Sequence, residues 1–135
     1  IDGNNLIWTQ DFKEIRSCDL TGSTPCQSEL LANSFSPIQG NYGIASIAGF
    51  LFWFDAFDNK IYACDTDSIP CTGVVIADGP TSGVDFPSSV DFRGFTMYWS
   101  NKFQIRSCDL LGADTPCQSV VNMNGDFVES SIEVK

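Results

Sequence analysis

Hydrophobic and polar positions follow one short pattern that recurs along the whole chain. Apolar runs rich in β-branched and aromatic side chains alternate with turns made of Gly, Pro, Asn and Asp. Runs of this kind predict β-strands, because a helix would need a longer pattern with a period of 3.6 residues. The expected strands fall into three groups of four. They are residues 5–10, 14–20, 26–31 and 42–47; 50–55, 60–65, 71–77 and 88–92; and 95–100, 104–110, 117–123 and 128–134.

Tryptophans and cysteines mark the length of the repeating unit. Trp8, Trp53 and Trp99 are 45 and 46 residues apart, and both cysteines of each unit recur at nearly the same interval. Four short strands in such a period are typical of a β-propeller, in which each unit forms one blade. A solenoid of paired helices has a similar period, but the β-branched and aromatic runs disfavour it. We therefore expect an all-β fold, a β-propeller segment with three four-stranded blades in a single half-propeller domain. This domain spans residues 1–135, with repeats at about 1–47, 48–92 and 93–135.

The order of the strands within the repeats predicts how the chain assembles. If the strands of a blade are named A to D from the axis outward, the chain begins with a strand B and ends with an unattached strand A at residues 128–134, which match 88–92. Three blades cannot close a ring, since propellers have about four to eight, and an open arc would expose two broad apolar faces. We therefore expect a homodimer in which two chains meet head to tail about a two-fold axis. Each chain's strand A would complete the partner's first blade in a six-bladed ring. A longer polypeptide, or a related second chain, would complete the ring equally well.

Each repeat contains two cysteines that bracket a turn. Opposed positions of a hairpin bring Cβ atoms close enough for a disulfide, so the repeat itself selects one pairing among those that six cysteines allow. The expected bridges are Cys18–Cys26, Cys64–Cys71 and Cys108–Cys117. A zinc site is disfavoured because the chain has no histidine. Disulfides indicate an oxidising compartment, and the start at Ile1 without a methionine leads us to expect a secreted chain whose signal peptide has been removed, although a fragment would begin in the same way.

Charge and the missing histidine narrow the classes of function. The formal net charge of −10 disfavours nucleic acid and anionic membrane surfaces, because both require basic patches. No apolar run is long enough for a transmembrane helix, so no membrane insertion is expected. Without histidine there is no Ser-His or Cys-His pair, and no two carboxylates stand out, so we expect a protein that is not an enzyme and needs no cofactor. Calcium could be held by the aspartates within residues 55–58 or 65–67, but aspartates in turns more often cap their own backbone.

Two strand motifs resemble a known family. Residues 51–55 read LFWFD and residues 97–101 read MYWSN, and each is followed by a strand that contains an isoleucine. With residues 42–45 as a strand A, the chain resembles the YWTD-repeat propellers of the LDL-receptor family over nearly its whole length. Asp55 has the place of the aspartate in that motif, and Asn101 has it in the third repeat. The resemblance implies a six-bladed propeller and an extracellular module that binds proteins.

One phenylalanine recurs in each of two loops per blade. In a propeller, the loops between strands B and C lie on the same face as those between strands D and A. The B–C turns contain Phe12, Phe57 and Phe103, and the D–A loops contain Phe35, Phe86 and Phe127. Polar neighbours on this face are Asp11, Asp58, Asn59 and Gln104. We predict a ligand site here, since an aromatic ring beside carboxylate or amide groups can stack on a sugar, anchor a peptide or hold an apolar molecule.

The same phenylalanines could instead serve as plugs packed between the blades. If they do form the site, the resemblance favours a protein or peptide ligand. The alternative is a multivalent lectin that binds glycans, because an aromatic and acidic loop in every blade would repeat the site around the ring. A further alternative is an extracellular structural protein or a carrier of small molecules.

Overall fold

The computed structural model describes most of the chain. The described residues are 3–11, 13–22, 24–33, 43–55, 58–85, 89–101, 103–112 and 115–125. Within them the chain forms twelve strands and one four-residue helix, which confirms the expected all-β fold.

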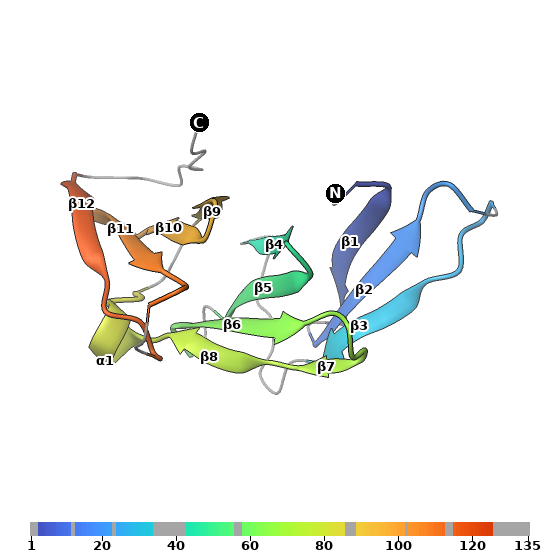
Figure 1. Ribbon diagram of the computed structural model, residues 1–135, viewed down its shortest axis with the longest axis horizontal. Helices are drawn as coiled ribbons and strands as arrows, with labels where there is room; N and C mark the ends of the chain where they lie inside the picture. Colours follow the sequence, from blue (N-terminus) through green and yellow to red (C-terminus); the bar gives the residue numbers. More distant parts are fainter. Residues whose placement is uncertain are drawn as a thin grey trace.

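The strands are arranged in three four-stranded sheets. The first sheet contains β1 (Asn5–Gln10), β2 (Glu14–Asp19), β3 (Glu29–Asn33) and β7 (Cys71–Thr72). The second contains β4 (Ile44–Ile47), β5 (Phe50–Asp55), β6 (Lys60–Asp65) and β8 (Val74–Ala77). The third contains β9 (Ser89–Arg93), β10 (Thr96–Ser100), β11 (Gln104–Asp109) and β12 (Val120–Asn124). In Figure 1 the sheets fan out side by side, with β1, β4 and β9 on the inner side of the fan.

The second and third sheets have the expected meander, but the first sheet is built differently. The strand orders β4-β5-β6-β8 and β9-β10-β11-β12 contain only antiparallel neighbours. In the first sheet, β1, β2 and β3 come from the first repeat, and within the described residues no strand lies on the inner side of β1. Its fourth strand, β7, comes from the second repeat and pairs in parallel with the outer edge of β3. The first sheet therefore ends at its inner edge with an unpaired strand in the described part of the chain.

The strands expected at residues 26–31, 71–77 and 117–123, the strand D of each blade, differ from their expected bounds. β3 and β12 begin at Glu29 and Val120, later than predicted, and the strand expected at residues 71–77 is divided into β7 and β8 at Gly73. The reason is that the turn between the two cysteines of each repeat continues beyond the second cysteine. Antiparallel pairing with the preceding strand starts only after that turn. A bulge then shifts the register at the same place in every sheet, directly after Ile15 in β2, Ile61 in β6 and Ile105 in β11.

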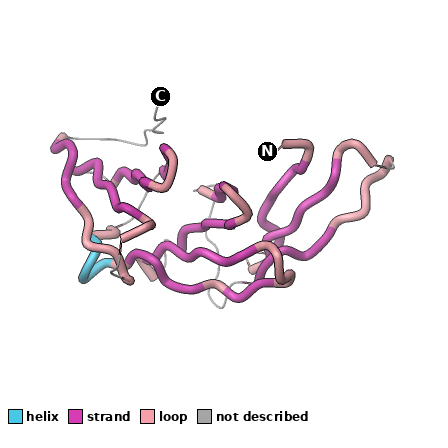
Figure 2. Tube along the Cα trace, viewed as in Figure 1, coloured by secondary structure: helices cyan, strands magenta, loops and turns pink. Residues whose placement is uncertain are grey.

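A short helix replaces part of the loop predicted between the second and third repeats. Helix α1 (Gly79–Ser82) follows Asp78, whose Oδ1 accepts a hydrogen bond from the Thr81 backbone N at 2.7 Å. Figure 2 shows this helix where the second sheet meets the third. Ser82 is fully buried there, and its Oγ donates a hydrogen bond to the Cys117 carbonyl at 2.6 Å. The helix therefore joins the second sheet to the loop of the third sheet that lies between Cys108 and Cys117, which we call its bridged loop.

All three expected disulfides are present. Cys18–Cys26, Cys64–Cys71 and Cys108–Cys117 join Cα atoms that are 6.0, 5.8 and 6.1 Å apart. An aspartate follows the first cysteine of each bridge, and its Oδ1 accepts a hydrogen bond from the backbone N two residues later. These aspartates are Asp19, Asp65 and Asp109. Asp65, one of the aspartates considered for calcium, therefore caps its own turn.

The hydrophobic core lies between neighbouring sheets. The cluster between the first and second sheets contains Ile15, Leu31, Ala32, Leu51, Trp53, Cys64 and Cys71. The cluster between the second and third sheets contains Phe54, Ile61, Ala77, Val84, Met97, Trp99, Cys108 and Cys117. Every residue of β5 after Phe50 is buried, as expected for a strand that is packed on both faces. In contrast, β1 is half-buried or exposed along its whole length, because no sheet precedes it in the described part of the chain.

A polar pair recurs on β2 of the first sheet and β11 of the third. Arg16 Nε donates a hydrogen bond to Ser28 Oγ at 3.2 Å, and Arg106 Nε donates one to Ser119 Oγ at 2.8 Å. In both repeats the serine lies two residues after the second cysteine. In each of these sheets the pair therefore links β2 or β11 to the end of the turn that its disulfide closes.

The second repeat replaces both members of this pair. Tyr62 has the place of the arginine, and its ring stacks on Trp53 with centroids 5.6 Å apart and planes 11° from parallel. Gly73 has the place of the serine, and a Cβ added there would lie 2.4 Å from Trp53 Cζ2. Because glycine has no side chain, the stacked rings of Trp53 and Tyr62 can occupy the space beside it. The replacement of the serine by Gly73 and that of the arginine by Tyr62 therefore belong together.

Candidate functional site

The ligand face predicted from the sequence is described only in part. Phe12, Phe35, Phe57, Phe86 and Phe127 lie outside the described residues. Asp11, Asp58, Asn59, Phe103 and Gln104 are described, and they lie in or directly after the turns that follow β1, β5 and β10. Because β1–β2, β5–β6 and β10–β11 are equivalent hairpins of sheets that lie side by side, these turns share one end of the fan.

The polar residues of the first two turns are engaged in local structure. Asp11 and Asn59 have φ values of 52° and 53°, the left-handed conformation that Asp and Asn tolerate better than most residues. The backbone N of Asp58 donates a hydrogen bond to Asp55 Oδ1 at 3.1 Å. The carboxylate of Asp58 lies 3.8 Å from Lys60 Nζ. These groups therefore stabilise the backbone of their own turns, and Lys60 offsets the charge of Asp58.

In the third turn, the exposed ring of Phe103 lies next to the side-chain amide of Gln104, which hydrogen bonds hold in place. Phe103 is 59% exposed. The Gln104 side chain donates from Nε2 to Asn124 Oδ1 at 3.2 Å, and its Oε1 accepts a bond from Arg106 at 2.5 Å. The backbone N atoms of Phe103 and Gln104 donate to Asn101 Oδ1 at 2.9 and 2.7 Å, so Asn101 caps this turn as Asp55 caps that of the second repeat. The predicted site at this face stays a prediction.

Among the described residues, two titratable groups have shifted pKa values, and neither supplies a catalytic acid or base near neutral pH. Burial raises the pKa of Tyr62, and the charges of Asp58 and Asp55 raise it further, so the phenol stays protonated. Hydrogen bonds from Thr21, including one from Oγ1 at 2.6 Å, lower the pKa of Asp19, which stays ionised. Within the described ranges, no three His, Cys, Asp or Glu side chains gather as metal ligands would.

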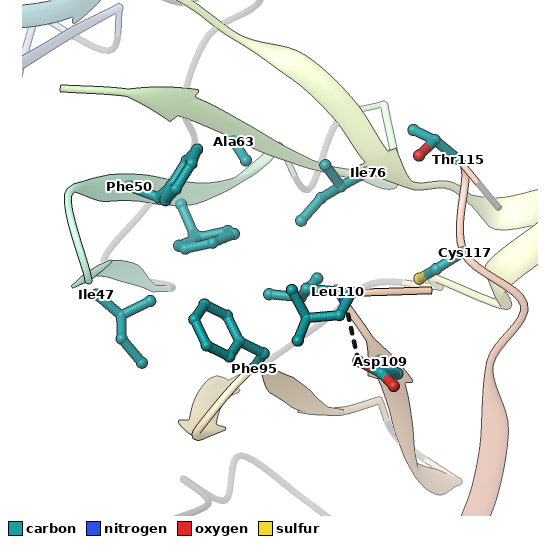
Figure 3. Close-up of a pocket in the computed structure, with 11 residues that line it drawn as sticks. Ile47, Phe50, Ala63, Ile76, Phe95, Asp109, Leu110, Thr115 and Cys117 are labelled. Carbon is teal, nitrogen blue, oxygen red and sulfur yellow. Dashed lines mark hydrogen bonds between the residues drawn. The ribbon is translucent and has the colours of Figure 1, made fainter. Parts of the chain in front are cut away.

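An apolar pocket opens between the second and third sheets, at the end of the fan opposite the predicted face. Its volume is about 190 Å³. The second sheet contributes Ile47, Phe50, Phe52, Ala63 and Ile76 to its lining. The third sheet and its bridged loop contribute Phe95, Asp109, Leu110, Leu111, Thr115 and Cys117. Figure 3 shows Phe50 and Phe95 approaching the pocket from opposite walls. None of the described residues predicted for the site lines this pocket.

The pocket combines a buried floor with an exposed apolar rim. Phe50, Phe95 and Leu111 remain 43%, 46% and 71% exposed at the rim. Phe52 below them is buried. The centroid of its ring lies 4.7 Å from that of the Phe92 ring, and the two ring planes are tilted by 41°. The floor is therefore fixed by packing, while the rim leaves large hydrophobic side chains in contact with water.

Two tight turns place the rim phenylalanines. Ala48 and Gly49 have φ values of 51° and 82°, and positive φ at both central residues is typical of the hairpin turn whose twist matches the flanking strands. Phe50 follows directly and pairs with Ile47 across the hairpin. The turn of the third sheet differs, because only Gly94 has positive φ, 58°, and Phe95 follows it as the second turn residue. Phe50 therefore begins its strand, whereas Phe95 is the last residue of its turn, and both line the pocket.

Hydrogen bonds hold the two walls of the pocket together. Cys117 N donates to the Ile76 carbonyl at 2.9 Å, and Ser82 Oγ donates to the Cys117 carbonyl at 2.6 Å. At the rim, Leu111 N donates to Asp109 Oδ1 at 3.0 Å, the bond dashed in Figure 3. The width of the pocket is therefore set before any ligand arrives.

The pocket occurs where the three repeats differ. The positions of Phe50, Phe95 and Leu111 are polar or small in the other repeats. Asn5 and Thr96 have the place of Phe50, and Asn4 and Gly49 have the place of Phe95. Thr21 and Asp67 have the place of Leu111. The sequence prediction missed this site because it searched for side chains that recur in every blade. The signal that could have revealed it is a phenylalanine directly at a turn glycine, where a hairpin more often has a polar residue.

Fold and site together define an all-β protein with three disulfides and an apolar pocket between two of its sheets. Neither models of protein families nor curated protein sequences match the chain. Among solved structures, the chain is similar to the computationally designed protein Ika8, with a TM-score of 0.61 and 11% sequence identity. The alignment covers 100% of this chain and 38% of that chain, so the chain spans well under half of the designed protein's length. At this identity the likeness concerns the fold alone. Within the residues described, no helix is long and apolar enough to cross a membrane.

Proposed function

We propose that the chain is a non-catalytic binding module that takes a protein or peptide ligand at the pocket between the second and third sheets. The exposed apolar rim above a preformed apolar floor carries this proposal. Contiguous apolar surface on a soluble protein marks interaction sites, and buried aromatic anchors supply most of the binding energy at protein interfaces. Phe50 and Phe95 are the expected anchors of this surface, because they face each other across the pocket.

The volume of the pocket favours a single large side chain as its occupant. Cavities of about 150 Å³ accept one benzene ring, whereas pockets for drug-sized molecules begin at about 300 Å³. A pocket of about 190 Å³ therefore suits one aromatic or long aliphatic side chain of a peptide. The net charge of −10 favours basic residues beside that anchor, since complementary charge speeds association and excludes acidic competitors.

The binding module would act as part of a six-bladed β-propeller formed by two chains. Three observations support this assembly: the repeated meander, the fan of sheets around a common inner side in Figure 1, and the resemblance to YWTD-repeat propellers. The match of the whole chain to only part of a longer designed protein agrees with a fold that continues beyond three sheets. The three disulfides support an extracellular location, because such bridges persist in oxidising compartments.

The test is a peptide-display selection on the wild-type protein, followed by affinity measurements with two matched variants. Phe95→Asn removes one anchor and introduces the residue that the first repeat has at this position. Phe103→Asn makes the same change at an exposed phenylalanine on the opposite face. Selected peptides should contain an aromatic or long aliphatic residue flanked by basic ones. Phe95→Asn should weaken them about 10- to 100-fold, the loss expected for one buried aromatic contact, and Phe103→Asn should leave them unchanged. Selection of no peptide, or loss of binding only in Phe103→Asn, would contradict the pocket as the site.

Carbohydrate binding is a second candidate, favoured by one observation. Phe103 presents a largely exposed ring beside the amide of Gln104, an arrangement suited to stacking on a sugar and bonding its hydroxyls. A glycan array separates the two functions. Glycan signals that disappear in Phe103→Asn and persist in Phe95→Asn would establish a lectin instead of a peptide-binding module.

A further inference from the structure

Both internal contacts between sheets are built from equivalent positions. β5 and β10 each place one aliphatic side chain and one tryptophan on the sheet that precedes them. The aliphatic residues, Leu51 and Met97, are fully buried with 0% exposure. Leu6 is their equivalent on β1, since all three pair with the first cysteine of the bridged loop, yet it is 41% exposed. The first sheet therefore presents a face that in the other two sheets is a buried contact.

The bridged loop of the first sheet is uncovered on the same side. Leu20 is exposed, whereas its equivalent Leu110 packs on the second core cluster. Cys26 is exposed, whereas its equivalents Cys71 and Cys117 are buried. We name this surface the front face. It consists of Leu6, Trp8, Leu20 and Cys26.

The other end of the fan has the matching surface. Ala32 on β3 and Ala77 on β8 are fully buried (0% exposed) under the sheet that follows. Their equivalent on β12 is Met123, which is 54% exposed. Ile105 is likewise only half-buried, although the isoleucines at its position in the first two sheets are buried. We name this surface the rear face. It consists of Ile105 and Met123.

Backbone groups at the two ends correspond as well. Between the first and second sheets, β7 pairs with β3 in parallel at Cys71. Between the second and third sheets, Cys117 N donates to the Ile76 carbonyl. At the ends of the molecule, the corresponding groups are Cys26 on the front face and the end of β12 at Met123 on the rear face. A front face that meets a rear face can therefore repeat the side-chain contact and the backbone contact together.

We infer that the front face of one chain binds the rear face of a second copy, so that two chains make two identical head-to-tail contacts and close. The inference rests on the proposed propeller assembly and identifies the surfaces that join in it. The fit follows from the molecule itself, because these faces are the equivalents of surfaces that already pack against each other twice within the chain. Closure by rotation uses both faces of both copies and leaves neither exposed.

The test measures the mass in solution by light scattering and the dissociation constant by sedimentation. The wild-type chain should have twice its mass of 14.8 kDa. Leu6→Asp and Met123→Asp each place a carboxylate in the contact, which should weaken association on the order of a hundredfold or more. The matched control is Val74→Asp on β8, which changes an exposed residue at a position where the first repeat has Glu29, and it should stay dimeric.

A mixture of the two interface variants tests the head-to-tail geometry. One contact between Leu6→Asp and Met123→Asp chains has both wild-type faces, so mixing should restore association that neither variant shows alone. If Leu6→Asp dissociates the assembly while Met123→Asp does not, the contact joins two front faces and the inference is overturned. A monomeric wild type, or a mass above two chains, overturns it too. Circular dichroism verifies that each variant is folded, as expected for changes at exposed positions.

The outcome can be told apart from failure of the proposed binding function. The pocket lies between two sheets of one chain, so Leu6→Asp should bind the selected peptides even as a monomer. In turn, Phe95→Asn should lose the peptides and stay dimeric. Retained peptide binding in a monomeric wild type would leave the function intact and refute the assembly alone.

Discussion

Gly73 is the position where a single added carbon should disturb the core most. A Cβ built there lies 2.4 Å from Trp53 Cζ2 and 2.5 Å from Cη2, and 3.2 Å from Tyr62 Cδ1. Carbon atoms in contact keep about 3.5–4.0 Å between them, so the indole would have to retreat by about 1 Å or more. Trp53 is buried between two sheets and Tyr62 stacks on it, so neither ring has room to move. The variant Gly73→Ala therefore tests whether the packing of these rings is as tight as the structure indicates.

The expected loss follows from two opposing contributions. Overpacking of a filled core costs about 1–3 kcal/mol. Replacing glycine by alanine also restricts the unfolded chain, which returns about 0.4–1 kcal/mol. From the mid-values of the two, the net destabilisation should be about 1.3 kcal/mol, which for a chain of this length lowers the melting temperature by about 5 °C.

The assay is thermal and urea-induced unfolding with the disulfides intact, compared with the control Gly22→Ala. A Cβ at Gly22 would have the Asp19 carbonyl as its nearest neighbour at 3.6 Å, an ordinary contact, so that variant should be neutral or slightly stabilised. Should Gly73→Ala melt within about 2 °C of Gly22→Ala, the reasoning from ring packing would be refuted.

A double-mutant cycle tests whether the two differences of the second repeat belong together. Gly73→Ser alone should destabilise, because its hydroxyl meets Trp53. Adding Tyr62→Arg recreates the arginine–serine pair that the other two sheets contain, and should recover about 0.5–3 kcal/mol, the range for coupled neighbours. Additive losses in the double variant would show that the pair is not an interchangeable unit.

Two further predictions follow from the bridged turns. Removing Cys108–Cys117 should lower the melting temperature more than removing Cys18–Cys26, although both loops have similar lengths, because only the former is buried against a neighbouring sheet through both of its cysteines; equal losses in calorimetry would contradict this. Thr21→Ala should raise the pKa of Asp19 in a carboxyl NMR titration, because it removes the hydroxyl bond that lowers it. Since a lowered pKa favours the folded state above the ordinary pKa and loses that effect as pH falls through the folded value, the wild type should keep this carboxylate ionised to lower pH than the variant; an unchanged titration would contradict the assignment.

Local patterns along the chain were sufficient for the strands and the bridges. β1, β5 and β6 have the predicted bounds, because an apolar run between turn residues is information that each segment contains by itself. The disulfides followed from the repeat, because equal spacing places each cysteine pair across the same turn. These strand bounds and the cysteine pairing depended only on neighbours in sequence or on the spacing of the repeat, and the described residues confirm them.

The bounds of the D strands and the edges of the first sheet depended on longer-range contacts. β7 pairs with β3, a strand of the preceding repeat, and no pattern within the repeat announces that pairing. The bulges after Ile15, Ile61 and Ile105, and the break at Gly73, follow from the bridged turn and from the ring of Trp53. These features arise from contacts across the fold, so composition and periodicity could not place their boundaries.

The sequence by itself determined the all-β class, the three repeats and the disulfide pairing, because each of these is encoded within about 45 residues and then written again. Only the tertiary structure decided where an apolar site opens and which surfaces stay uncovered. Phe50 and Phe95 lie in different repeats and meet only because two sheets pack side by side. Leu6 and Leu51 are equivalent in sequence, yet one is exposed and the other buried, because burial depends on whether another sheet lies in front.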